Sequence, residues 1–361
     1  MHLTYLKAVN FRNFPQVDIE PCPGVNIFYG LNGSGKTNLL EAIFLLCLGR
    51  SQRGNGDAVL LKENEETYRI EGKIQASEIS HEIAIAYLNR GRKQITIDGV
   101  KSRLPELYER FSAVAIGPED SEILSGAPSV RRLFMDLYIS QYSPKYLKQL
   151  ARYNRIVAQK NAALKDQVEF DSYNALMVES GSEIMRARDQ FVKVLQKTSG
   201  EYYERFSSGS RLKIEYQPSA LKAADFDEKM VESEFEIRLD EVREKEKIIK
   251  TALIGPHRDE IQFSINDLPA RTHGSQGEWR SSAIALKLAV YNFIKEKRKF
   301  APILLLDEIF AELDNQRSEQ LINSFAAFEQ LFLTTATEPP EQLRQNAKNF
   351  KINNGAIEKI N

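Results

Sequence analysis

Hydrophobic and polar positions divide the start of the chain into short strands followed by a helix. Residues 3–11, 17–20 and 25–29 are β-rich stretches, which predict strands. A glycine-rich turn comes next. From residue 36 to 48 the apolar side chains recur at helical spacing, and Gly49 ends the pattern. The predicted order of elements is therefore strands, loop and helix.

The middle of the chain changes from a β-pattern to a helical one. Apolar and polar residues alternate across residues 68–98 with turn residues between the runs, which predicts a small antiparallel sheet. Over residues 129–206 glycines are rare and the apolar spacing is helical, so we expect two to four helices. The acidic stretch 225–247 is interpreted as a solvated helix or an exposed linker.

The last third of the chain combines both patterns. Residues 261–265 again follow a β-pattern, a long helix is expected from Gln276, and the apolar run 303–306 predicts a buried strand. Together with the opening elements, these segments predict an α/β fold with a mostly helical insertion.

Length and composition narrow the class of protein. The 361 residues correspond to about two domains, and the 42% hydrophobic and 27% charged residues are typical of globular proteins. No apolar run approaches the ~20 residues that a membrane helix needs, and no secretory signal pattern is present. Two cysteines, Cys22 and Cys47, fit a reducing compartment and exclude a disulfide framework. We therefore expect a cytoplasmic protein without a membrane contact.

The glycine-rich turn matches the phosphate-binding pattern G-x-x-x-x-G-K-[ST]. A predicted strand precedes the turn and a predicted helix follows it, which is the context that this motif requires. Successive backbone N–H groups would face phosphate oxygens, Lys36 would bridge the β- and γ-phosphates of ATP, and the Thr37 hydroxyl would bind Mg²⁺. The predicted nucleotide-binding residues are Gly30, Leu31, Asn32, Gly33, Ser34, Gly35, Lys36 and Thr37.

Two carboxylates end the predicted strand 303–306. Asp307 is the candidate metal-side acid, and Glu308 is the candidate catalytic base that polarises water against the γ-phosphate. Asp307 lies 271 positions after Lys36. A single α/β core does not need so much chain, so a domain is expected between the two halves of the nucleotide site.

Short polar motifs accompany these halves. Residues 275–278 (Ser275, Gln276, Gly277 and Glu278) stand at a predicted helix start. They suit either a second phosphate-binding edge or an ordinary N-cap. Residues 312–314 follow the carboxylate pair and could carry a contact across an interface. In the turn 255–259, a histidine is more often structural than catalytic.

Taken together, these motifs resemble the head of an ABC-type ATPase of the SMC branch. Within that branch, the opening L-x-x-F-R-N-F, the P-E-D at 118–120, the G-P-H-R-D at 255–259 and the G-S-Q-G-E at 274–278 resemble the RecF family of bacterial recombination mediators. The resemblance covers essentially the whole chain. It implies a head split in sequence, with residues 1–115 and 251–361 as its halves and 116–250 as an inserted helical domain.

The resemblance also implies a mechanism and partners. ATP would join two heads into a homodimer, so that Ser275 and Gly277 of one subunit contact the γ-phosphate held by the other, with Asp314 in the D-loop. The family binds double-stranded and single-stranded or gapped DNA, is a slow DNA-stimulated ATPase with Mg²⁺, and works with RecR, and indirectly RecO and RecA. The alternatives are an SMC-like mechanical ATPase, disfavoured because no long heptad pattern is present, and a P-loop metabolic kinase.

The sequence departs from the family pattern at three points. Trp279 stands where a polar residue is common. Residues 333–337 contain no histidine, so γ-phosphate sensing would be done by a threonine or be absent. No Q-loop glutamine is evident beside Pro118, which leaves one metal contact unassigned.

A basic, tyrosine-containing stretch at 129–160 is the candidate DNA-binding segment. Because the formal net charge is −1, a polyanion would have to meet a local patch. The alternative is a solvated helix face with its tyrosines in the core. The DNA-binding candidates are Arg131, Arg132, Lys145, Lys148 and Arg152.

Overall fold

The structure of the protein is a computed structural model, which describes all residues except 53–55, 77, 89–90, 208, 223–227, 313–314, 340 and 359–361. The chain divides into two compact units. Unit 1 comprises Met1–Asp120 and Lys287–Asn361, and unit 2 comprises Ser121–Leu286.

The second unit boundary differs from the one expected at residue 250. Residues 251–286 cluster with unit 2 because strand β10 (Glu260–Ile265) pairs antiparallel with β9 (Leu212–Gln217). This pairing joins segments more than forty residues apart, which periodicity along the sequence does not report. Unit 2 therefore contains the motif at 275–278 as well as the helices.

One sheet of unit 1 is built from short buried strands. Its order is β15-β14-β3-β13-β12-β8, and its strands are parallel except for β15. All residues of β12 are buried, as expected where a parallel sheet is covered on both faces. The strands are β3 (Gly24–Tyr29), β8 (Ala113–Ile116), β12 (Ile303–Leu306), β13 (Gln330–Thr335), β14 (Ala347–Asn353) and β15 (Ala356–Glu358).

A second sheet of unit 1 is antiparallel, with the order β2-β1-β4-β5-β6-β7. It includes the sheet predicted at 68–98 and extends it with the two N-terminal strands. Alternating burial along β4 shows one face packed and the other open. The strands are β1 (His2–Phe11), β2 (Phe14–Ile19), β4 (Tyr68–Ala76), β5 (Ile79–Leu88), β6 (Arg92–Ile97) and β7 (Val100–Ser102).

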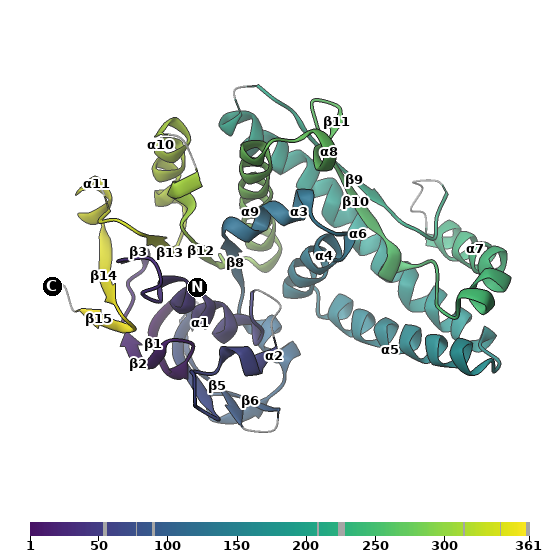
Figure 1. Cartoon of the computed structure of the whole chain (residues 1–361), viewed down its shortest axis with the longest axis horizontal. Helices are drawn as coiled ribbons and strands as arrows, with labels where there is room; N and C mark the ends of the chain where they lie inside the picture. Colours follow the sequence, from purple (N-terminus) through teal and green to yellow (C-terminus); the bar gives the residue numbers. More distant parts are fainter. Residues whose placement is uncertain are drawn as a thin grey trace. The chain divides into compact units, whose positions relative to one another are not determined.

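Helix α1 (Lys36–Leu48) packs against strands of both sheets (Figure 1). From Leu39 to Leu48 every residue is buried, which is the pattern of a helix surrounded by protein. The helix is therefore fixed on all sides, and its N-terminus holds the predicted phosphate loop. The remaining elements of unit 1 are η1 (Asp57–Leu60), α2 (Leu104–Arg110), η2 (Pro118–Ser121, whose last residue belongs to unit 2), η4 (Ile309–Glu312), α10 (Asn315–Ser324), η5 (Phe325–Ala327) and α11 (Glu341–Arg344).

Unit 2 combines long helices with the sheet β11-β10-β9 (Figure 1). From Glu228 onward the acidic stretch is a helix, α7, and not a linker, because Val231, Phe235 and Leu239 are buried on one of its faces. The elements are α3 (Glu122–Ser125), α4 (Pro128–Tyr142), α5 (Pro144–Asp166), α6 (Asp171–Phe206), α7 (Glu228–Ile249), η3 (Pro256–Arg258), β11 (Leu268–Pro269) and α8 (Ala270–His273). Helix α9 (Gln276–Arg298) begins in unit 2 and ends in unit 1.

The G-P-H-R-D turn is a structural centre of unit 2. The fully buried Arg188 guanidinium donates to Pro256 O at 2.6 Å and to Asp259 Oδ2 at 3.1 Å. It also pairs with Asp136 Oδ1 at 2.8 Å, so its charge is compensated from two elements. His257 Nδ1 lies 2.8 Å from Tyr153 Oη, and burial lowers the pKa of His257 to about 4. Through these contacts the turn connects the helices of unit 2 to the sheet of the same unit.

Candidate nucleotide-binding site

The phosphate loop is supported by two neighbouring segments of unit 1. Asn13 Nδ2 donates to Ser34 O at 3.0 Å, and Gly355 N donates to the same oxygen at 3.1 Å. Gly35 has a φ of +114°, and a Cβ there would lie 2.6 Å from Asn13 Nδ2. Only glycine fits this position without displacing its neighbour. The asparagine of the F-R-N motif, Asn13, therefore stabilises the phosphate loop, a role that the sequence alone did not specify.

The Lys36 ammonium lies inside the loop that it would serve. Its Nζ donates to Gly30 O at 2.9 Å and to Leu31 O at 3.1 Å, and lies 3.4 Å from Glu308 Oε1. The side chain is buried. A phosphate entering the loop would meet a cation that is already desolvated and oriented, and the strongest hydrogen bonds form to such charged donors.

Thr37 and Asp307 meet although they lie far apart in the sequence. Thr37 Oγ1 donates to Asp307 Oδ1 at 2.9 Å, and the hydroxyl of Thr334 donates to the same oxygen at 2.7 Å. Thr334 is fully buried and also accepts a hydrogen bond from Glu308 N at 2.8 Å. Thr334 therefore orients the end of β12 from the neighbouring strand β13, instead of pointing its hydroxyl to a phosphate.

Asp307 and Glu308 face the same cavity because the backbone turns between them. Glu308 has a φ of +48°, a left-handed conformation that costs a non-glycine residue roughly 1–2 kcal/mol. In a regular strand, consecutive side chains would point to opposite faces. Strain of this kind persists where the surroundings hold it, here the hydrogen bond from Glu308 N to Thr334.

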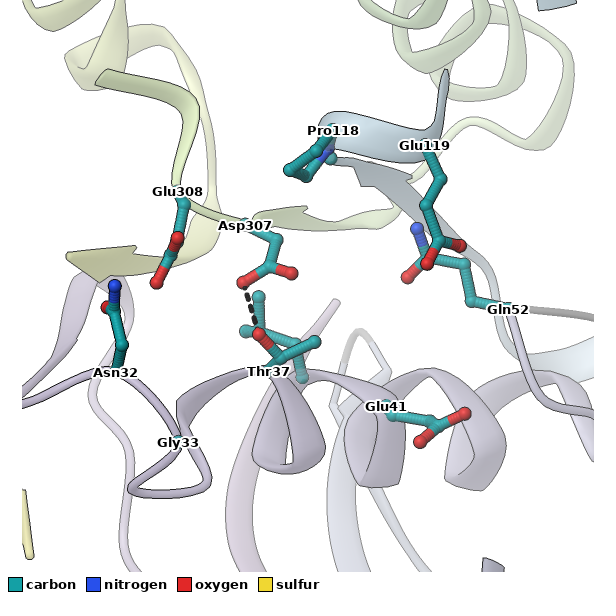
Figure 2. Close-up of a pocket in the computed structure, with 11 residues that line it drawn as sticks. Asn32, Gly33, Thr37, Glu41, Gln52, Pro118, Glu119, Asp307 and Glu308 are labelled. Carbon is teal, nitrogen blue, oxygen red and sulfur yellow. Dashed lines mark hydrogen bonds between the residues drawn. The ribbon is translucent and has the colours of Figure 1, made fainter. Parts of the chain in front are cut away.

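These residues line a cavity of about 430 Å³ within unit 1 (Figure 2). It is large enough for a small ligand, and its floor is the N-terminus of α1, which favours anions. The lining residues are Asn32, Gly33, Thr37, Leu40, Glu41, Gln52, Gly117, Pro118, Glu119, Asp307 and Glu308.

The oxygen donors of this cavity fit Mg²⁺. A hydroxyl and a carboxylate 2.9 Å apart, Thr37 and Asp307, are the hard ligands that Mg²⁺ takes besides phosphate and water. The buried Ser34 Oγ has no hydrogen-bond partner among the described residues. A phosphate oxygen would supply one. When bound, the metal would neutralise charge on the phosphates, while Lys36 and the loop orient them.

The signature residues lie in unit 2 and satisfy one another. Ser275 N and Ser275 Oγ each donate to Glu278 Oε2 at 2.8 Å, and Glu278 N donates to Ser275 Oγ at 3.3 Å. This is a capping box at the start of α9, so the local N-cap interpretation holds. Ser275, Gln276 and Gly277 are nevertheless exposed, and a Cβ at Gly277 would meet nothing within 4 Å.

Two further predicted features have different outcomes. Trp279 Nε1 donates to Ala270 O at 2.7 Å, so the unusual tryptophan anchors the signature turn to α8. Asp314, the predicted D-loop residue, lies outside the described residues.

The basic stretch is only partly available to DNA. Arg131 is buried, and its guanidinium pairs with both carboxylate oxygens of Glu260, at 2.5 and 2.7 Å. Arg131 is therefore a structural residue, which corrects its assignment to the DNA-binding set. Arg132 is half-buried and donates to Asp259 O at 2.9 Å.

The other three DNA-binding candidates lie on α5 with their side chains reaching the surface, whereas Lys160 of the same helix is fully buried in an ion pair with Glu246. Lys145 pairs with Glu183 at 2.8 Å, Arg152 pairs with Glu179 at 2.7 Å, and Lys148 is exposed. Such surface pairs are weak and exchange readily for phosphate. Three tyrosines of the stretch, Tyr138, Tyr146 and Tyr153, belong to the core of unit 2.

Three lining residues were not predicted as site residues. Glu41 and Gln52 face the cavity but belong to no motif that marks them, and Glu119 belongs to the P-E-D motif, to which the sequence assigned no role in the site. The one available signal was position: Glu41 lies one helical turn after Thr37 on α1, and side chains four apart share a face.

Comparisons with known proteins cover the whole chain. Residues 2–358 match the family described as RecF/RecN/SMC N terminal domain. The DNA replication and repair protein RecF of Lysinibacillus sphaericus is 32% identical over 370 residues, covering 99% of this chain and 100% of the relative. The RecF protein of Halalkalibacterium halodurans is 33% identical over 370 residues, with the same coverage.

Solved structures agree with the sequence comparison. A recombination mediator protein RecF–ATP structure from the RecFOR pathway aligns with a TM-score of 0.92 at 30% identity, covering 100% of this chain and 98% of that one. An Smc head domain from Pyrococcus furiosus aligns with a TM-score of 0.57 at 17% identity, which supports the fold alone. None of the helices in the described part of the chain combines the length and hydropathy needed to span a bilayer. With the phosphate loop, the carboxylate pair and the split head in place, the chain belongs to the RecF family of SMC-type ABC ATPase heads.

Proposed function

We propose that this chain is an ATP-dependent DNA-binding recombination mediator of DNA replication and repair. The observation that carries the proposal is the arrangement of Thr37, Asp307 and Glu308 around one cavity at the start of α1, with the Lys36 ammonium 3.4 Å from Glu308. Cation, hydroxyl and paired carboxylates in this arrangement suit hydrolysis of a phosphoanhydride with Mg²⁺. The RecF names of the relatives supply the DNA context.

In this proposal the resting enzyme turns over slowly because its site is incomplete in one chain. Lys36 and Thr37 bind ATP and Mg²⁺, and Glu308 accepts the proton of the attacking water. The exposed Ser275 and Gly277 of a second copy then close the site over the γ-phosphate. ATP thus acts as the link of a homodimer whose lifetime is set by hydrolysis.

DNA would bind to the exposed cations of α5, Lys145, Lys148 and Arg152, without reading sequence. We infer gapped DNA or a junction of single and double strands as the preferred substrate, with RecR as the direct partner and RecO and RecA acting later. We also infer a cytoplasmic location. A P-loop metabolic kinase, the rival from another class, would show no change of ATP turnover with DNA.

The test measures DNA binding by fluorescence anisotropy, using a gapped duplex with and without ATP and Mg²⁺. The parent should bind more tightly with ATP, and gapped DNA should raise the rate of phosphate release. Lys148→Ala should weaken binding and lower the slope of log affinity against log salt by about one. Lys213→Ala on β9 is the matched control, because it removes an exposed lysine charge outside α5. The proposal would be contradicted if ATP left the DNA affinity unchanged and gapped DNA left the rate of phosphate release unchanged.

A further inference from the structure

The cavity has a second polar side, opposite the proposed base. In the view of Figure 2 the pair Thr37 and Asp307 lies between Glu308 on one side and Gln52 with Glu119 on the other. Mg²⁺ requires near-octahedral coordination and usually keeps several waters. Those waters need acceptors on the side away from Glu308. Side chains that hold bound water in place contribute to metal affinity even though they do not touch the metal.

Glu41 lines this side but is not available to a metal. Arg12 Nε donates to Glu41 Oε2 at 2.7 Å, and Arg12 donates through a second nitrogen to Oε1 at 3.0 Å. The Ser51 hydroxyl also donates to Oε1, at 2.6 Å. Both carboxylate oxygens are thus engaged. The paired guanidinium also cancels a negative charge that would otherwise lie, buried, one turn from the phosphate loop.

The same contacts fix the segment that follows α1. Arg12 N donates to Leu60 O at 2.8 Å, and the Arg12 side chain donates to Val59 O at 2.9 Å. Ser51, bound to Glu41, is buried and directly precedes Gln52. The cluster of Arg12, Glu41 and Ser51 therefore fixes the backbone on which Gln52 stands. The amide of Gln52 itself makes no hydrogen bond to any described residue.

We propose that Gln52 binds the water shell of the nucleotide's Mg²⁺ through its amide oxygen, and that Arg12, Glu41 and Ser51 are the positioning residues that hold it there. The inference rests on the proposed nucleotide function and deepens it. It supplies an amide on the metal side of the site, from the segment after α1 instead of from the turn at Pro118.

The experiment compares two variants of nearly equal size, Gln52→Leu and Gln52→Glu. Mn²⁺ replaces Mg²⁺, and its affinity for the ATP-bound full-length protein is measured by electron paramagnetic resonance. ATP affinity in EDTA is measured in parallel. Gln52→Leu should weaken Mn²⁺ binding about tenfold, since loss of an outer-shell partner typically costs that much, and should leave ATP affinity in EDTA unchanged. Gln52→Glu, which keeps an oxygen, should retain the parental Mn²⁺ affinity.

The positioning role is tested by Ser51→Ala, a mild change that leaves the Arg12–Glu41 pair intact. It should weaken Mn²⁺ binding less than Gln52→Leu does, at an unchanged melting temperature, and should add nothing when combined with Gln52→Leu. Parental Mn²⁺ affinity in Gln52→Leu overturns the inference while the proposed function stands. A parent that binds neither ATP nor Mn²⁺–ATP overturns both.

Discussion

The phosphate loop and the signature turn are both candidate phosphate sites, yet their surroundings are opposite. The loop is braced by Asn13 and Gly355, and a Cβ at Gly35 would collide with its neighbours. The signature turn is exposed, and a Cβ at Gly277 would meet nothing within 4 Å. Its hydrogen bonds run between Ser275 and Glu278.

The difference bears on the proposal that the ATP site is completed by a second chain. A braced loop holds its N–H groups and lysine ready for phosphate, so binding needs little rearrangement. An exposed glycine with open space above it suits the approach of another molecule's atoms. The contrast supports a composite site in which unit 1 of one copy holds ATP and unit 2 of another closes over it.

The largest effect is expected from Glu308→Gln. Removing the carboxylate that accepts a proton should reduce turnover by about 10²–10⁴-fold, while ATP and metal binding persist. The variant should also prolong any ATP-held dimer, which sedimentation with ATP would detect. Phosphate release at the parental rate would mean that another residue is the base.

The second effect concerns the braced loop. Lys36→Ala removes a buried charged donor, and ATP affinity should fall by about two orders of magnitude. Isothermal titration with ATP and Mg²⁺ measures this. Lys36→Arg should also bind poorly, since a planar guanidinium does not fit where a point charge lies. An unchanged ATP affinity in both variants would contradict the assignment of this loop as the phosphate-binding loop.

The third prediction uses one substitution at two glycines. Gly35→Ala forces a side chain into Asn13 at a φ of +114° and should destabilise the protein by about 1–3 kcal/mol. Gly277→Ala lies in the exposed first turn of α9 and should change stability by less than about 1 kcal/mol. Thermal unfolding compares them. Equal losses of stability would contradict the contrast between the two regions.

Much of the braced region could be predicted from local sequence. The loop 30–37, the helix after it and the strand 303–306 carry short-range patterns, because glycine placement and apolar periodicity are local properties. The convergence of Thr37 with Asp307 follows from the parallel order of β3, β13 and β12, and strand order is not a local property of the sequence.

What the sequence could not predict depends on long-range contacts. Arg131 has the same charge as Lys148, but a glutamate 129 positions away makes it a buried structural residue. The order of the strands places Thr334 beside Asp307. The Arg12–Glu41 pair helps to fix the segment that carries Gln52. Charge and residue type along the chain do not report burial.

The most direct test of the composite site mixes two inactive variants. A Lys36→Met chain lacks the phosphate-binding lysine, and Ser275→Arg places bulk and charge at the signature without changing its own phosphate loop. If the signature acts in trans, a mixed dimer has one site with both lesions and one with neither, so the mixture should regain part of the parental ATPase rate. No recovery, with mixed dimers shown to form, would contradict the account, because a signature acting within its own chain leaves a lesion in every site.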